Sequence, residues 1–101
     1  GSLANCGAGL RMSIPVPASS AVDTHVLIVP KRHIATLNDL TPEDDGIVGE
    51  LVRCAAGIAN TRGLSGGGYR TVFNTNREAG QTVFHIHLHL LAGRTLTWPP
   101  G

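Results

Sequence analysis

Three histidines stand at alternate positions in the segment 81–93, QTVFHIHLHLLAG. Successive side chains of an extended strand point to opposite faces, so His85, His87 and His89 are predicted to lie in a row on one face. Val83 would lie in the same row. The opposite face would carry the apolar residues Phe84, Ile86, Leu88 and Leu90. We therefore predict a strand over 81–93 that packs its apolar face on a core and presents imidazoles on the other.

Such a row favours a chemical role, because charged rings would repel each other and histidine adds little to packing. Metal binding is one interpretation, but nitrogens on one zinc ion lie only about 3.3 Å apart. His85 and His89, roughly 13 Å apart along a strand, can hardly reach the same ion. A zinc site would need a further ligand, and neither Cys6 nor Cys54 stands in a spacing such as C-x-x-C. The alternative is that one histidine is a nucleophile or general base and its neighbours handle protons or anionic oxygens.

The segment HIHLHLLAG resembles the histidine triad motif, His-φ-His-φ-His-φ-φ with φ apolar, of the histidine triad (HIT) superfamily. The resemblance is to the branch of histidine triad nucleotide-binding proteins that hydrolyse nucleoside phosphoramidates, and it covers about residues 24–101. The matching segments are VLIVPKRHI (26–34), GYRTVFN (68–74), AGQTVFHIHLHLLAGR (79–94) and WPPG (98–101).

The resemblance implies roles for four histidines. The middle histidine of the motif, His87, would attack phosphorus and become transiently nucleotidylated. His89 would bind the phosphate or protonate groups around it, and His85 with His25 would support charge and proton flow behind it. His33 would belong to a turn that is mainly structural.

The resemblance also implies a set of substrate-binding residues. Asn74 would contact leaving-group and phosphate oxygens, and Gly80 and Gln81 would line the leaving-group side. Thr82 would donate to the bridging atom. The set is completed by Val83 and Trp98.

The implied reaction is hydrolysis of a P–N bond in a purine nucleoside phosphoramidate, which releases a nucleoside monophosphate. No metal or other cofactor is required by this scheme, with zinc binding as an alternative. Two further alternatives stay open: a nucleotide-binding or scaffolding module with weak or no catalysis, and a dinucleoside polyphosphate hydrolase. The WPPG ending and the length of the chain favour the phosphoramidase branch.

One position departs from the family pattern. Relatives usually carry an amphipathic helix and two strands ahead of the region that matches Thr24, and one strand ends in an aspartate that binds the ribose hydroxyls. Pro17 stands at that position and has no side-chain acceptor. The chain has either lost this grip on the nucleoside or holds the ribose otherwise.

Composition excludes several classes of protein. The chain has 101 residues, 42% of them hydrophobic and 15% charged, with a formal charge of +1. This balance predicts one globular domain and gives no basic surface for nucleic acid or anionic membrane. No stretch of 18 apolar residues predicts a membrane span. Two cysteines without a pairing motif indicate a reducing compartment, which favours the cytoplasm, with nucleus or organelle as alternatives.

The remaining segments predict the fold. A buried strand is expected over 25–30, a helix over about 41–63 with Cys54 off its apolar stripe, and a strand over 69–74. Residues 1–23 read as an atypical N-terminal arm, in which 12–16 could run extended along a sheet edge, and 24–101 as the histidine triad domain. The fold class is α+β, with an antiparallel sheet of about four to five strands and one long and one short helix. The resemblance implies a homodimer in which the sheet is continuous.

Overall fold

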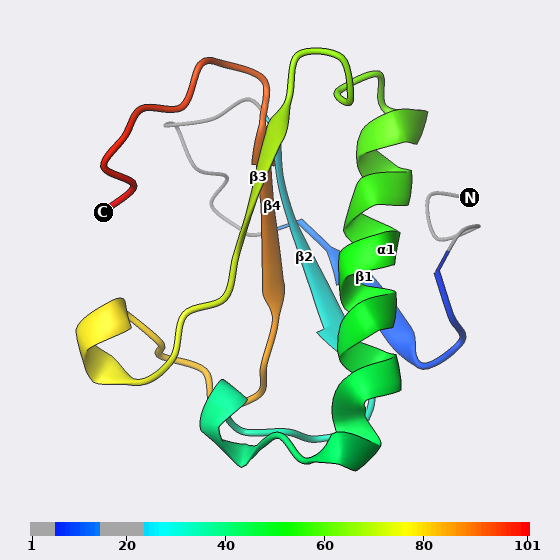
Figure 1. The fold of residues 1–101 in the computed structure, drawn as a ribbon, viewed down its shortest axis with the longest axis vertical. Helices are drawn as coiled ribbons and strands as arrows, with labels where there is room; N and C mark the ends of the chain where they lie inside the picture. Colours follow the sequence, from blue (N-terminus) through cyan, green and yellow to red (C-terminus); the bar gives the residue numbers. More distant parts are fainter. Residues whose placement is uncertain (1–5, 15–23) are drawn as a thin grey trace.

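The computed structural model describes residues 6–14 and 24–101. Its four strands form one antiparallel sheet in the order β1-β2-β4-β3, and the helix α1 (Asp45–Thr61) covers one face of it (Figure 1). The strands are β1 (Leu10–Ser13), β2 (Thr24–Pro30), β3 (Tyr69–Val72) and β4 (Leu88–Ala92). The predicted α+β fold with an antiparallel sheet and one long helix is confirmed.

The core lies between α1 and the sheet. Along β2 the alternation of an extended strand places Val26 and Ile28 under the helix, fully buried, while Leu27 and Val29 face the other side. β4 contributes Leu88 and Leu90 to the same core. The face of the sheet away from α1 is therefore left for the histidines.

The helix differs in detail from its prediction. Its first turn is a 3-10 helix, Pro42–Asp44, which is capped by a bond from the Thr41 amide to the Asp44 carboxylate at 2.9 Å. The apolar stripe is also shifted, since Val52 is 50% exposed and Cys54 is fully buried. The expectation that Cys54 lies off the apolar face is wrong, because this residue belongs to the core and its sulfur is bonded to Cys6.

The prediction of a strand over the whole of 81–93 is wrong for its first half, because β4 begins only at Leu88. The preceding residues bond to the turn after β2: the Ile86 amide donates to the Ile34 carbonyl at 2.7 Å. The predicted alternation of buried and half-buried residues holds from 85 to 92. Phe84 is 51% exposed and does not join the core, contrary to the prediction.

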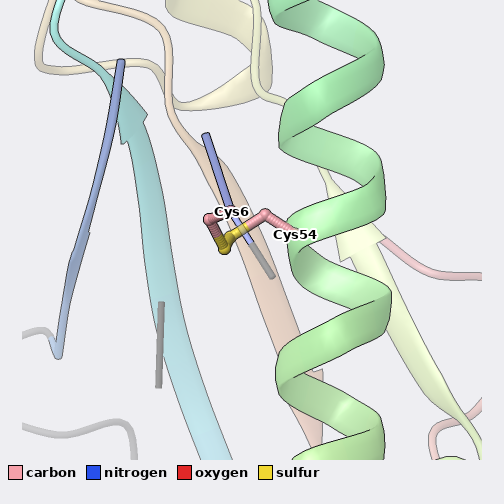
Figure 2. The surroundings of a disulfide bond; sticks show 2 residues. All are labelled: Cys6 and Cys54. Atoms are coloured by element: carbon pink, nitrogen blue, oxygen red, sulfur yellow. A yellow bond between two sulfur atoms is a disulfide. The ribbon is translucent and has the colours of Figure 1, made fainter. Parts of the chain in front are cut away.

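A disulfide joins Cys6 to Cys54, 48 residues apart in sequence. Figure 2 shows how it ties the segment before β1 to α1. The interpretation of both cysteines as unpaired is wrong, and the inference of a reducing compartment loses its basis. No spacing motif marks this pair, because only the packing of the helix on the sheet brings the two residues together.

β1 is an edge strand beside β2, and Leu10 pairs with Pro30. An extended segment at a sheet edge was expected over 12–16, and the strand begins two residues earlier. Pro17, at the position of the family's ribose-binding aspartate, lies outside the described residues. In the described ranges, no helix is long and apolar enough to cross a membrane.

Two further 3-10 helices complete the connections. Leu37–Asp39 lies between β2 and α1, and Arg77–Ala79 lies between β3 and β4.

Reducing the disulfide should destabilise the fold. Opening a covalent loop of this length restores freedom to the unfolded chain, so Cys6→Ser should lower the free energy of unfolding by about 2 to 4 kcal/mol. Urea denaturation of the variant and of the wild type, each with and without dithiothreitol, measures the change. The reductant should destabilise the wild type and leave Cys6→Ser unchanged. Equal midpoints for oxidised and reduced wild type would contradict this account.

Candidate active site

The three triad histidines lie on the face of the sheet opposite α1, at the start of β4. His89 lies within β4 and pairs with Leu27 of β2, while His85 and His87 precede the strand. The His87 and His89 rings lie 4.9 Å apart between centroids. The structure thus brings the predicted residues together, half-buried, on one surface.

The backbone fixes the tautomer of His87. Its Nδ1 lies 2.8 Å from the carbonyl oxygen of His85. A carbonyl only accepts, so Nδ1 of His87 carries the proton and donates it. In the neutral ring Nε2 then keeps its lone pair, as a nucleophile or base requires.

His85 is held in the same manner by the opposite nitrogen. Its Nε2 donates to the carbonyl of Pro30 at 2.6 Å, which leaves Nδ1 of the neutral ring as an acceptor. Nδ1 of His33 lies 3.4 Å from this atom, and the two rings meet edge to face. Sequence reasoning missed this contact, because the turn that carries His33 is far from the triad along the chain.

His89 belongs to a second chain of contacts. Its Nδ1 lies 2.9 Å from Nε2 of His25. Its Nε2 lies 3.5 Å from the side-chain nitrogen Nδ2 of Asn74. With Asn74 donating, neutral His89 keeps its proton on Nδ1 and donates it to His25. The rings of His25 and His89 stack at 5.1 Å. Nδ1 of His25 is buried and has no hydrogen-bond partner among the described residues.

Burial keeps this pair neutral. The pKa of His89 is lowered from 6.5 to about 4. Desolvation by burial is the largest cause, and repulsion from protonated His87 and His25 adds to it. Desolvation also lowers the pKa of His25. Both rings therefore enter any reaction at neutral pH without charge.

The loop before the triad is fixed by Gln81, which is buried with 6% exposure. Its side-chain Nε2 donates to the carbonyls of Ala35 and Val83 at 2.8 and 3.0 Å. Its Oε1 accepts from the backbone amide of Asn76 at 2.8 Å. This side chain therefore positions the loop. Gly80, at φ +85°, makes the left-handed turn into it.

A pocket of about 230 Å³ opens beside the nucleophile candidate. Its lining residues are Arg11, Leu27, Val29, Val83, His85 and His87. No motif in the sequence marked the residues from β1 and β2 as pocket residues. For β2 the alternation of a strand could have indicated them, because Leu27 and Val29 must face away from the side that carries the buried Val26 and Ile28.

Other predicted substrate-binding residues lie at the rim or away from it. Thr82 is exposed next to the pocket-lining Val83. Trp98 is 81% exposed and lines a separate depression of about 430 Å³ along β3 with Val72 and Phe73. Within one chain, Trp98 is not a lining residue of the pocket beside His87.

Comparison with known proteins identifies the family. The HIT domain model matches residues 11–96, which include β2, β3, β4, the helix α1 and all three triad histidines. The chain belongs to the HIT domain family. A HIT family hydrolase from Legionella pneumophila has the same fold with a TM-score of 0.89 and 44% identity, over 94% of this chain and 83% of that one.

Curated HIT relatives match the same region. An uncharacterized HIT-like protein of Synechococcus elongatus is 49% identical over 77 residues, 76% of this chain and 67% of that protein. The purine nucleoside phosphoramidase of Escherichia coli is 46% identical over 78 residues, 77% of this chain and 66% of that protein. The chain thus spans about two thirds of the length of these relatives, which support hydrolase activity in general terms.

The described residues of this HIT domain hold no group of three or more histidine, cysteine, aspartate or glutamate side chains arranged to bind a metal ion.

The neutral His89 predicts a pH dependence of stability. The unfolded chain binds a proton here with the ordinary pKa of 6.5, whereas the folded state does so only near 4. The stability contributed by neutral His89 is therefore present above pH 6.5 and lost as the pH falls from about 6.5 to about 4. Chemical denaturation across this range should show the loss, and His89→Gln should show a shallower one. Identical slopes would contradict the assigned pKa.

Proposed function

We propose that this chain hydrolyses the P–N bond of purine nucleoside phosphoramidates through a nucleotidyl-histidine intermediate. The observation that carries the proposal is the bond from Nδ1 of His87 to the His85 carbonyl, which leaves Nε2 as a neutral nucleophile. A neutral attacker suits this substrate, because anionic phosphoryl oxygens repel an anionic one. The Escherichia coli relative, named a purine nucleoside phosphoramidase, supports the substrate class.

In the first half-reaction Nε2 of His87 attacks phosphorus and the P–N bond breaks. The ring gains positive charge as the new bond forms, and the His85 carbonyl stabilises it through the proton on Nδ1. The Pro30 carbonyl holds His85 in place behind it.

The departing amine needs a proton, since an amide anion is a poor leaving group. His89 is neutral before substrate binds, and an anionic phosphoryl group beside it favours its protonated form. Nε2 of His25 accepts the Nδ1 proton of His89, and we assign Asn74, whose side-chain nitrogen lies 3.5 Å from Nε2 of His89, the contact with the phosphoryl oxygens. General acid catalysis of this kind contributes roughly 10² to 10⁴ in rate.

In the second half-reaction water attacks the phosphorus of the nucleotidyl-histidine. The bond from phosphorus to Nε2 of His87 breaks, and a nucleoside monophosphate leaves. The His89–His25 pair takes the proton of the attacking water. Exposed Thr82 lies at the rim where the bridging atom would sit, and we assign it the bond to that atom.

Replacing His87 by asparagine should remove turnover. The amide is a poor nucleophile, so release of amine from a fluorogenic adenosine phosphoramidate should fall roughly 10³-fold or more. Rapid quench and mass spectrometry should detect a nucleotidylated wild-type chain and none in the variant.

The comparison variant is His33→Asn, which changes a ring that contacts His85 but lies outside the triad, and it should still form the nucleotidylated intermediate. Circular dichroism should show that both variants fold. Undiminished turnover by His87→Asn would remove His87 from the nucleophile role. A folded wild-type chain without turnover would instead favour a nucleotide-binding module.

We further propose that two copies pair along β3. This strand is at the edge of the sheet, and Tyr69 on it is 39% exposed. A free edge offers unpaired backbone groups to a second strand, so a two-fold pairing would extend the sheet through both copies. The tail with Trp98 runs beside β3 and would reach the partner's site.

Light scattering at micromolar concentration should give the mass of a dimer. Trp98→Ala should raise the dissociation constant at least about tenfold, because an exposed aromatic anchor is lost. Val52→Ala, which removes part of an exposed apolar side chain on α1, should leave it unchanged. A monomeric wild type would contradict the proposal.

A further inference from the structure

The Cys6–Cys54 disulfide holds the start of the edge strand β1 on the fold. Cys54 is fully buried on α1, and Cys6 is half-buried shortly before β1. Figure 2 shows the bond between this segment and the helix. In the described part of the chain β1 has one neighbouring strand, β2. The disulfide is therefore a second, covalent tie beside the hydrogen bonds of that pairing.

A hydrogen bond connects the tied segment to the end of β2. The amide of Lys31 donates to the carbonyl of Gly9 at 2.7 Å. Gly9 is exposed, and two small residues separate it from Cys6. Glycine gives the backbone more freedom than any other residue. The position of the Gly9 carbonyl thus depends on an anchor at each side, the disulfide before it and the pairing of Leu10 with Pro30 after it.

The peptide group that bonds to Gly9 also holds a triad histidine. The peptide between Pro30 and Lys31 places its N–H on Gly9, and its carbonyl accepts from Nε2 of His85 at 2.6 Å. A peptide group is planar and rigid, so a rotation that breaks one of these bonds also misaligns the other. The two bonds polarise the same amide and strengthen each other. A short path therefore leads from the disulfide through Gly9 and this peptide to His85.

His85 is the point at which this path meets the catalytic machinery. Its ring is held by the Pro30 carbonyl, and its own carbonyl accepts from Nδ1 of His87 at 2.8 Å. His85 lies ahead of β4, outside the ladder of the sheet. Releasing its ring from Pro30 therefore leaves its carbonyl less firmly placed, and fewer molecules then present Nε2 of His87 in the productive orientation.

We propose that the Cys6–Cys54 disulfide is a redox switch for the triad: the oxidised chain holds His85 in place, and reduction by a dithiol releases it. The switch regulates the site of the proposed function, and its effect on turnover rests on that function. Cys6 and Cys54 are positioning residues, because both act through the Pro30–Lys31 peptide.

Reduction proceeds by thiol–disulfide exchange. A thiolate of the dithiol attacks Sγ of Cys6, the less buried residue of the pair, and the bond to Sγ of Cys54 breaks. Cys54 leaves with the electron pair and takes up a proton, since its apolar surroundings disfavour a thiolate. The second thiolate of the dithiol then displaces Cys6, which is protonated in turn. Two electrons and two protons pass to the cysteines, and the dithiol closes to a cyclic disulfide.

The first test needs no substrate. Nitrogen-15 NMR of the full-length chain follows the backbone amide of Lys31 and the ring N–H of His85 before and after reduction with dithiothreitol. In the oxidised chain the His85 ring proton should give a downfield signal, because it is hydrogen-bonded. Reduction should remove this signal through exchange with water and move the Lys31 amide upfield. The dispersed amide signals of α1 and β4 should persist, because the domain stays folded.

The second test measures turnover of the fluorogenic adenosine phosphoramidate in both redox states. Reduction should lower kcat/KM about fivefold, as expected when a positioning hydrogen bond is lost. Reoxidation should restore turnover and the His85 signal together. Cys6→Ser should resemble the reduced wild type with or without dithiothreitol. The matched control is Arg53→Ala, which changes the exposed neighbour of Cys54 and keeps the disulfide, so it should respond as the wild type does.

A His85 ring signal that survives both reduction and Cys6→Ser would overturn the proposal. Loss of the dispersed α1 and β4 signals on reduction would also overturn it, because unfolding of the whole domain would then explain the lost activity. Failure of the proposed function looks different. Neither redox state would then release amine, while the Lys31 and His85 signals would still respond to reduction.

Discussion

A single hydrogen bond, from Nδ1 of His87 to the carbonyl of His85, sets the chemistry of this site. It joins residues two apart, so its geometry depends on the backbone of one short segment. The segment leaves the hydrogen-bond ladder of the sheet just before β4. The carbonyl of His85 is therefore bonded to the side chain of His87 and not to a neighbouring strand. Irregular backbone at this point is therefore what allows the imidazole to present an unprotonated nitrogen.

That segment is held in place by hydrogen bonds to the connection that follows β2. Ile86 and Gln81 both bond to backbone there, and the connection itself is tied to the start of α1 by the ion pair of Arg32 with the buried Asp44 at 3.0 Å. The bonds to the carbonyls of Ile34 and Ala35 fix the position of residues 81–86 relative to the sheet. These backbone contacts and this ion pair thus help to position the ring of His87.

The sequence allowed prediction of the features that follow from short-range pattern. The alternation of buried and half-buried residues in β4 comes from the pleat of a strand, and the apolar run 26–29 predicted the strand β2; the structure has both. Contacts between distant segments were not predictable in this way. The Cys6–Cys54 bond, the approach of His33 to His85 and the place of Arg11 in the pocket all depend on how separate elements pack. No local pattern in the chain encodes such packing.

The order of the sheet has a consequence for synthesis on the ribosome. β4 is the last strand in sequence, yet it lies between β2 and β3. Until it emerges, both neighbours lack a partner on their inner sides, and Val26 and Ile28 lack Leu88 and Leu90. The contacts that complete the sheet therefore span much of the chain and form late. A nascent chain that stops short of β4 has neither a closed core nor His89, so folding and the capacity for chemistry arrive with the same few residues.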